Sequence, residues 1–158
     1  MLEQSFSDIY TKFKLNFYRK IFTRFDKRES SLTAVETFCV EVIHALYMPT
    51  INEFARFVKI SQPNATYKVQ SLMKKGYIEK IQSPEDRREY RLHVTEKYFE
   101  YYGVTTNYVN EVLNRMQHRF SSEELEALER IMSVINEELM PEIHLNRYDP
   151  SITPPLME

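Results

Sequence analysis

Apolar residues recur at steps of three or four from Phe6 to Phe25, and this spacing predicts one long helix with a single apolar face. The same period returns after residue 98, first in a helix that ends near Phe120 and then in a helix with a heptad-like seam. The seam consists of Leu125, Leu128, Met132, Ile135 and Leu139. Stripes of this length would leave much apolar surface in water, so we expect the outer helices to pack against a second copy of the chain.

Shorter helices are expected between the outer ones, because two Thr-x-x-Glu patterns match a capping box. In Thr33 with Glu36 and in Thr50 with Glu53, the hydroxyl can accept from a free N–H while the carboxylate reaches back. The first of these helices should end before Pro49, and the second should run to about residue 58. The side of the first helix that is predicted to face the core consists of Val35, Phe38, Cys39, Val42, Ile43 and Leu46.

The next segment predicts a helix-turn-helix followed by a hairpin. Ser61 can cap a helix from about 62 to 75, and Gly76 can supply its left-handed stop. A short helix, a tight turn and a second helix closed by glycine are typical of a helix-turn-helix. Strand-like residues at 77–82 and 89–94 then enclose a polar loop, which predicts a wing. In the second strand the residues expected to share one side are Tyr90, Leu92 and Val94.

Together these elements predict a mainly α (α+β) protein, with a winged helix-turn-helix lobe and long N- and C-terminal helices that form a dimerisation region. The expected domains are an N-terminal dimerisation helix at 1–30, the lobe at 31–97, C-terminal dimerisation helices at 98–141 and a tail at 142–158. Thr95 is expected to cap the helix that follows the lobe.

Composition narrows the classes of function. A single cysteine, the absence of a secretory leader and the absence of an apolar run of about 18 residues favour a soluble cytoplasmic protein without a membrane partner. Two glycines argue against Gly-rich phosphate loops. Because no nucleophile–base pattern or metal cluster emerges either, we expect no enzyme activity, no cofactor and no metal.

The formal net charge of −2 is distributed unevenly. Residues 59–93 hold eight Lys or Arg against four Asp or Glu, a net charge of +4, which leaves −6 for the rest of the chain. A basic footprint confined to one stretch is typical of a DNA-binding module, although a solvated basic face would give the same count.

If the helix at 62–75 enters a major groove, the residues opposite its apolar stripe of Ala65, Val69, Leu72 and Met73 face the bases. Asn and Gln can pair with adenine through two hydrogen bonds, while Ser, Thr and Lys can reach base edges or phosphates. The candidate DNA-binding residues are therefore Ser61, Gln62, Asn64, Thr66, Lys68, Gln70 and Ser71. The same polar face could also be simply solvated.

Two arginines in the predicted wing, Arg87 and Arg88, are further DNA-binding candidates, because a narrow minor groove attracts guanidinium groups. Asp86 beside them would face phosphate unfavourably. We therefore expect its carboxylate to orient an arginine through a bidentate pair and so to position the wing.

In this order and spacing, the motifs resemble the MarR family of bacterial regulators. The resemblance rests on residues 61–66, 75–79, 86–88 and 92–97 and covers about residues 32–97 closely. It implies a homodimer with interlocking terminal helices, two winged lobes on a pseudo-palindromic operator and a small-molecule pocket. Tyr98 departs from the glycine that is usual in the family, which bears on how the following helix begins.

The expected function is that of a sequence-specific transcriptional regulator, a repressor that binds double-stranded DNA as a homodimer and is released by a small apolar or aromatic effector. The alternative is a winged-helix module that binds only proteins. Cys39 is interpreted as a small hydrophobe rather than an oxidant sensor, and the pair Glu41 and His44 as structural rather than metal-binding. Aromatic stripes in the outer helices favour a dimer interface over an effector pocket.

Overall fold

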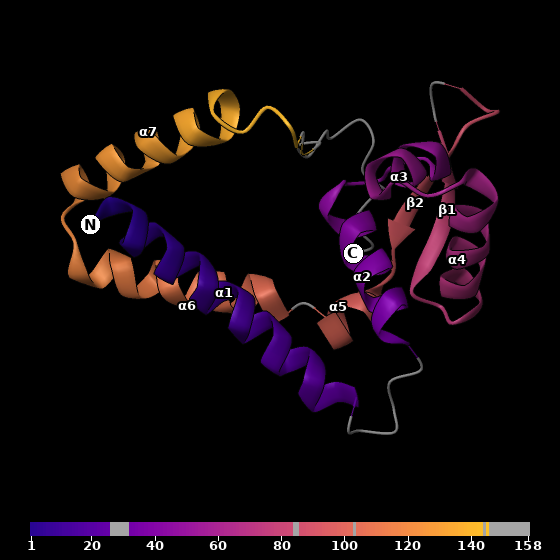
Figure 1. The fold of residues 1–158 in the computed structure, drawn as a ribbon, viewed down its shortest axis with the longest axis horizontal. Coiled ribbons are helices and arrows are strands. Elements are labelled where there is room, and N and C mark those ends of the chain that lie inside the picture. The colour runs from indigo at the N-terminus through magenta and orange to yellow at the C-terminus, as the bar shows by residue number, and fades with distance from the viewer. Residues whose placement is uncertain (26–31, 84–85, 103, 144, 146–158) are drawn as a thin grey trace, which may run out of the picture. The chain divides into compact units, whose positions relative to one another are not determined.

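The computed structural model describes residues 1–25, 32–83, 86–102, 104–143 and 145. Within these residues the protein is mainly helical with one two-stranded antiparallel sheet, so the predicted fold class is confirmed (Figure 1). The elements are α1 (Leu2–Phe25), α2 (Ala34–Ala45), α3 (Ile51–Val58), α4 (Gln62–Lys74), β1 (Ile78–Gln82), β2 (Tyr90–Val94), α5 (Glu96–Tyr102), α6 (Val104–Arg119) and α7 (Ser122–Glu138).

Contacts between residues divide the chain into two compact units. The helical unit holds α1, α6 and α7, and the lobe holds α2, α3, α4, both strands and most of α5. In the part of the chain that the structure describes, no helix is long and apolar enough to cross a membrane.

The helices begin where the capping patterns predict. Thr33 and Thr50 each accept a hydrogen bond from the backbone N–H three residues later, and the glutamates there accept from the caps' own N–H groups at 2.8 Å. Ser121 forms a third capping box at the start of α7. Ser61 caps α4 by accepting from the N–H of Asn64 at 3.4 Å.

The core of the lobe includes side chains from α2, α3, α4 and β2 that are at most 1% exposed, among them Val40, Ile43, Phe54, Val69, Leu72 and Leu92. The predicted side of α2 is confirmed in part, since Cys39, Ile43 and Leu46 are buried. Val35 and Phe38, however, are 53% and 50% exposed, whereas Thr37 is buried. Helical spacing predicts which residues of α2 share an apolar side. The contacts of α2 with β2 and α4 determine which of these residues face the core.

The two strands form the hairpin that the sequence predicts, with Ile78 opposite Val94. Leu92 and Val94 are buried, but Tyr90 is 48% exposed because it lies at the end of β2 that adjoins the hairpin loop. The N–H of Leu92 also donates to the carbonyl of Pro49 at 2.8 Å. This bond attaches the chain just before α3 to the sheet.

Gly76 ends α4 in a left-handed conformation, at φ 79°, as its position predicts. Thr95 directly precedes α5, where it was predicted to be the cap; its hydroxyl donates to the Gly76 carbonyl at 2.6 Å, and its own carbonyl accepts from the N–H of Tyr98 at 3.0 Å. The contact with Gly76 ties the beginning of α5 to the end of α4.

In the helical unit α1 packs against α6, and the rings of Phe13 and Tyr108 meet edge-on with centroids 5.4 Å apart. α1 begins at Leu2, earlier than its apolar stripe indicates. The helix predicted to end near Phe120 is divided into α5 and α6, and of the predicted tail only residues 142, 143 and 145 are described. None of the residues of α7 is buried.

Candidate nucleic-acid interface

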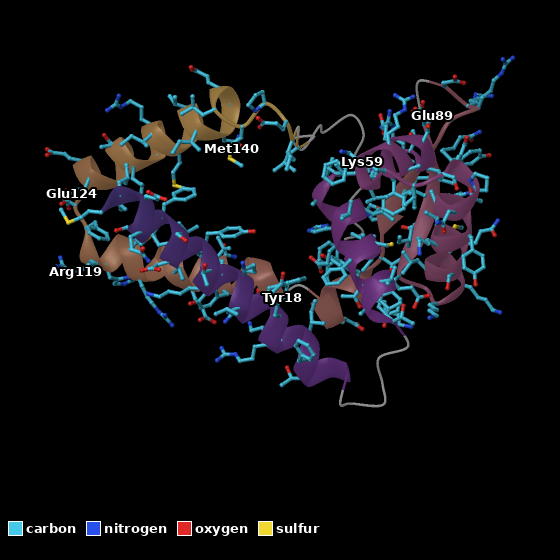
Figure 2. All side chains as sticks on the ribbon, in the orientation of Figure 1. Tyr18, Lys59, Glu89, Arg119, Glu124 and Met140 are labelled. Carbon is cyan, nitrogen blue, oxygen red and sulfur yellow. The ribbon has the colours of Figure 1, made fainter. Side chains whose placement is uncertain are left out.

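The turn between α3 and α4 fixes the outward side of α4. Lys59, labelled in Figure 2, is left-handed at φ 56° and ψ 45°, and the N–H of Ile60 donates to the carbonyl of Ala55 at 3.0 Å. Three residues of α4 are then completely buried: Ala65, Val69 and Leu72. The opposite side of α4 therefore faces away from the lobe.

The structure brings most of the predicted α4 residues to that outward side. Ser61, Gln62, Asn64 and Gln70 are exposed, whereas Thr66 and Lys68 are half-buried at its flanks. The helix contains no Asp or Glu, so nothing on it repels an anion. The sequence prediction left out Tyr67, which is 72% exposed.

Ser71 was predicted to contact DNA, but in the structure it forms a hydrogen bond within the lobe. Its hydroxyl donates to Glu36 Oε1 at 2.6 Å, and the Lys75 ammonium lies 2.7 Å from Oε2 of the same carboxylate. Glu36 also accepts the N–H of Thr33, so one side chain joins the start of α2 to the end of α4. We therefore treat Ser71 as a residue that positions α4.

The charge of Glu36 is strongly favoured in the folded protein. Burial by itself would raise the pKa of this carboxyl, but the hydrogen bonds from Lys75, Ser71 and Thr33 outweigh it and lower the pKa to about 2. The Glu36 side chain is only 13% exposed. The network is thus intact at any pH at which DNA binding would be studied.

The hairpin loop between the strands, residues 83–89, is the wing, and Figure 2 labels Glu89 at its base. The Asp86 carboxylate accepts the backbone N–H of Arg88 at 2.8 Å, and the amide of Gln82 donates to the Arg87 carbonyl at 2.6 Å. The predicted bidentate pair between Asp86 and an arginine is therefore wrong. A short carboxylate closes a local turn more readily than it holds a long, solvated guanidinium.

Arg87 and Arg88 are exposed, and no ion pair is formed by either guanidinium with any described residue. Hydrogen bonds from Gln82 and to Asp86 hold the backbone at Arg87 and Arg88, while their guanidinium groups are exposed and can bind another molecule. The wing thus presents two cations in a fixed place.

Arg91 stabilises the base of the wing, a role that sequence reasoning missed. Its guanidinium lies 2.7 Å from Glu89, 3.7 Å from Glu53 and 3.2 Å from the Met48 carbonyl that it donates to. The side chain is only 21% exposed. The charges of Arg91 and Lys75 are therefore used in ion pairs within the lobe. Both residues belong to the eight Lys and Arg counted in residues 59–93, so fewer of those cations are left to contact DNA.

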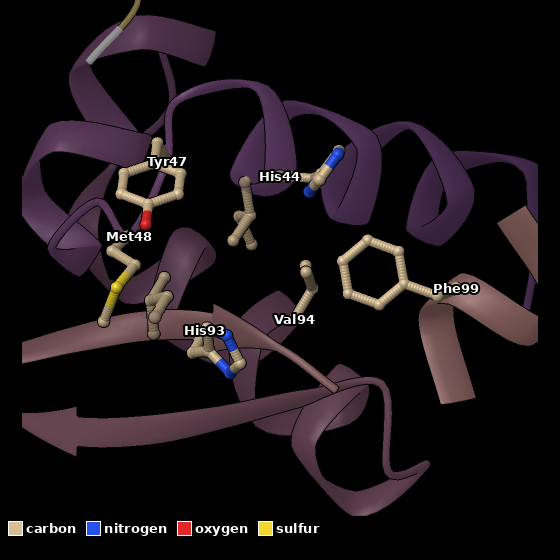
Figure 3. Close-up of a pocket in the computed structure, with 8 residues that line it drawn as sticks. His44, Tyr47, Met48, His93, Val94 and Phe99 are labelled. Atoms are coloured by element: carbon tan, nitrogen blue, oxygen red, sulfur yellow. The ribbon is translucent and has the colours of Figure 1, made fainter. Parts of the chain in front are cut away.

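A small apolar pocket lies inside the lobe, and Figure 3 shows His44 and Phe99 at one end of it and Tyr47 and Met48 at the other. Its lining is Ile43, His44, Tyr47, Met48, Leu92, His93, Val94 and Phe99. Its volume is about 70 Å³. Pockets for drug-sized ligands enclose roughly 300–1,000 Å³, so this pocket is much smaller.

Next to the pocket, the hydroxyl of Tyr98 donates to Glu41 Oε1 at 3.0 Å. Burial raises the pKa of Glu41 to about 7, although this hydrogen bond opposes the shift. Burial and the nearby His93 lower the pKa of His44. Glu41 is thus a half-buried titratable group whose partner is Tyr98, whereas the sequence had paired it with His44.

Cys39 is 7% exposed, and burial raises the pKa of its thiol, which disfavours the reactive thiolate. Its interpretation as a small hydrophobe agrees with this environment. Among the described residues, no group of three or more His, Cys, Asp or Glu is placed to hold a metal ion.

Comparison with known sequences agrees with this geometry. Residues 32–90 match the model of the MarR family. The HTH-type transcriptional regulator BilQ from Clostridioides difficile is 30% identical over 88 residues, which are 56% of this chain and 60% of that protein. The chain thus spans about 60% of the length of this curated relative, and its similarity to the MarR family lies in residues 32–90.

Solved structures share the fold over most of the chain. Streptococcus pneumoniae FabT in complex with DNA is 18% identical, with a TM-score of 0.56, and the match covers 90% of this chain and 97% of that one. A MarR-like transcriptional regulator from Thermotoga maritima is 22% identical, with a TM-score of 0.55, over 87% of this chain and 94% of that one. At these identities the likeness concerns the fold alone.

Proposed function

We propose that the lobe binds double-stranded DNA and that the protein acts as a transcriptional regulator. The observation that carries this proposal is the outward side of α4, which is polar and free of acidic residues, together with Arg87 and Arg88 of the wing, whose guanidinium groups form no ion pair with a described residue. Similarity to BilQ, which is named a transcriptional regulator, and to FabT, which was solved with DNA, supports it. A protein with this function acts in the cytoplasm, where the chromosome lies.

In this proposal α4 lies in a major groove and the wing reaches an adjacent minor groove. The residues assigned to DNA are Ser61, which also caps α4, and Gln62, Asn64, Thr66, Lys68, Gln70, Arg87 and Arg88. Asp86 positions the wing through its turn, and Ser71 positions α4 through Glu36.

Replacing Arg87 or Arg88 with alanine should weaken binding to a selected DNA fragment by about 1–3 kcal/mol, the range for a lost charge-assisted contact. The fold should survive, because both side chains are exposed. Fragments are first selected from a genomic library with the unaltered protein, and dissociation constants are then compared by fluorescence anisotropy.

Arg130→Ala provides the matched control, since Arg130 is an exposed arginine of α7 in the helical unit. This control should bind DNA like the unaltered protein. Equal binding by all three variants would show that the wing does not contact DNA, and a protein that selects no fragment would point to a module that binds other partners.

We also propose that the helical unit forms a homodimer with a second copy of the chain. Its helices expose large apolar side chains, among them Phe6 at 60%, Ile9 at 56%, Ile131 at 50% and Met132 at 58%. Monomeric soluble proteins rarely leave so many apolar side chains in water. Two lobes related by a twofold axis would bind a pseudo-palindromic operator, and a bound dimer that blocks transcription would be a repressor.

Sedimentation equilibrium at micromolar concentration should give twice the chain mass of 19.0 kDa. Met132→Lys places a charge in the exposed apolar seam and should produce monomer, whereas Ser133→Lys adds the same charge at the neighbouring exposed position and should leave the dimer. A monomeric unaltered protein would refute the dimer.

Release of the DNA by a small apolar or aromatic effector completes the proposed function. The pocket of about 70 Å³ in the lobe is too small for such a ligand by itself. We therefore assign no residues of this pocket to the effector.

A further inference from the structure

Tyr67 is the most exposed large apolar side chain that the structure describes in the lobe, at 72%. A step of about 100° per residue places it nearly opposite the mean direction of the buried residues Ala65, Val69 and Leu72. It therefore stands at the centre of the outward side of α4. Because the phenol ring is exposed to water at this position, it buries little apolar area and does not stabilise the fold.

Exposed amide side chains flank the ring on the same helix. Asn64 and Gln70 lie three residues before and three residues after Tyr67, which is the spacing of neighbours on a helix surface. Amides of this kind pair with the N6 and N7 atoms of adenine in the major groove. The partner of each adenine is a thymine, whose 5-methyl group is the apolar feature of the same groove.

Building on the proposed DNA binding, we propose that Tyr67 determines specificity by contacting a thymine 5-methyl group in the major groove, next to A·T pairs read by Asn64 and Gln70. The ring supplies an apolar surface at the centre of an otherwise polar side. Its contribution is a preference for thymine over bases that lack the methyl group.

The test replaces single thymines by deoxyuridine, which removes only the methyl group, in a duplex selected by the unaltered protein. At one position in each half-site the unaltered protein should lose about fourfold in affinity, which corresponds to the roughly 0.8 kcal/mol of one buried methyl group. Tyr67→Ala should bind the thymine and uracil duplexes equally at that position. Tyr67→Phe should keep the difference, because the ring and not the hydroxyl makes the contact.

Lys74→Ala is the matched control on the same exposed side of α4. It should change the affinity for both duplexes by the same factor and leave their ratio unchanged, since a lysine side chain carries no preference for the thymine methyl group. Circular dichroism confirms that each variant is folded.

Two results would overturn the role of Tyr67 while leaving DNA binding in place: no thymine position sensitive to the methyl group, or equal sensitivity in the unaltered protein and in Tyr67→Ala. Failure of the unaltered protein to bind any duplex would instead contradict the proposed function itself.

Discussion

Glu41→Gln should remove most of the pH dependence of folding stability between pH 4.5 and pH 7. The pKa of Glu41 is raised from its usual 4.5 to about 7, so the folded state binds a proton that the unfolded state has released. The stability from the neutral carboxyl is complete below pH 4.5 and is lost as the pH rises through 7. A shift of this size corresponds to about 3 kcal/mol.

Glutamine keeps the volume of Glu41 and can still accept the hydrogen bond from Tyr98, but it has no charge to bury. The variant should therefore unfold like the unaltered protein at pH 4 and be more stable than it at pH 8. Urea denaturation across this range, at a fixed protein concentration because a dimer is expected, measures the difference.

The histidines near Glu41 must be considered when the pH profiles are compared. His44 on α2, whose pKa is lowered by burial, contributes a residual slope in both proteins, and His93 on β2 lies 3.0 Å from Glu79. Glu96→Gln, at an exposed position of α5, should leave the profile unchanged. If Glu41→Gln and the unaltered protein had parallel profiles, the burial of this carboxyl would not be energetically important.

Glu36→Ala should destabilise the lobe by about 3 kcal/mol, because one carboxylate serves both the capping box of α2 and the side chains of Ser71 in α4 and of Lys75 just after it. The cap contributes about 1 kcal/mol and the charge-assisted bonds from Lys75 and Ser71 contribute the rest. Since the pKa of Glu36 is depressed to about 2, this stability is complete above pH 4.5 and is lost as the pH falls through 2.

Glu53→Ala is the matched comparison, since Glu53 forms the same capping box on α3 but has only a 3.7 Å contact with Arg91 beyond it and is 49% exposed. It should cost about 1 kcal/mol. Urea midpoints of the two variants at pH 7 measure the contrast. Equal losses would mean that the link between α2 and α4 contributes nothing.

The features that the sequence predicted correctly are local. A capping box needs only a residue and its third neighbour, and a glycine stop needs only one position, so Thr33, Thr50, Ser61 and Gly76 were identified before any tertiary contact was known. The anchored side of α4 followed from its period for the same reason.

The features that the sequence did not predict depend on residues far apart in the chain. Glu36 meets Ser71 across 35 positions, and Glu41 meets Tyr98 across 57. The hydrophobic period along a helix does not predict such pairs, because they form only when α2 packs beside α4 and α5. The turn at Asp86 was misassigned for another reason: backbone N–H groups compete with side chains for a carboxylate.

The most direct test of the central claim is the salt dependence of binding between the unaltered protein and its selected duplex, measured by anisotropy from low to physiological ionic strength. Cations on α4 and the wing should displace condensed counterions, so the logarithm of the affinity should fall steeply and linearly with the logarithm of salt concentration. Removing Arg87 and Arg88 together should reduce the slope by roughly two units for each bound lobe. Absent binding, or binding that is independent of salt, would contradict the account.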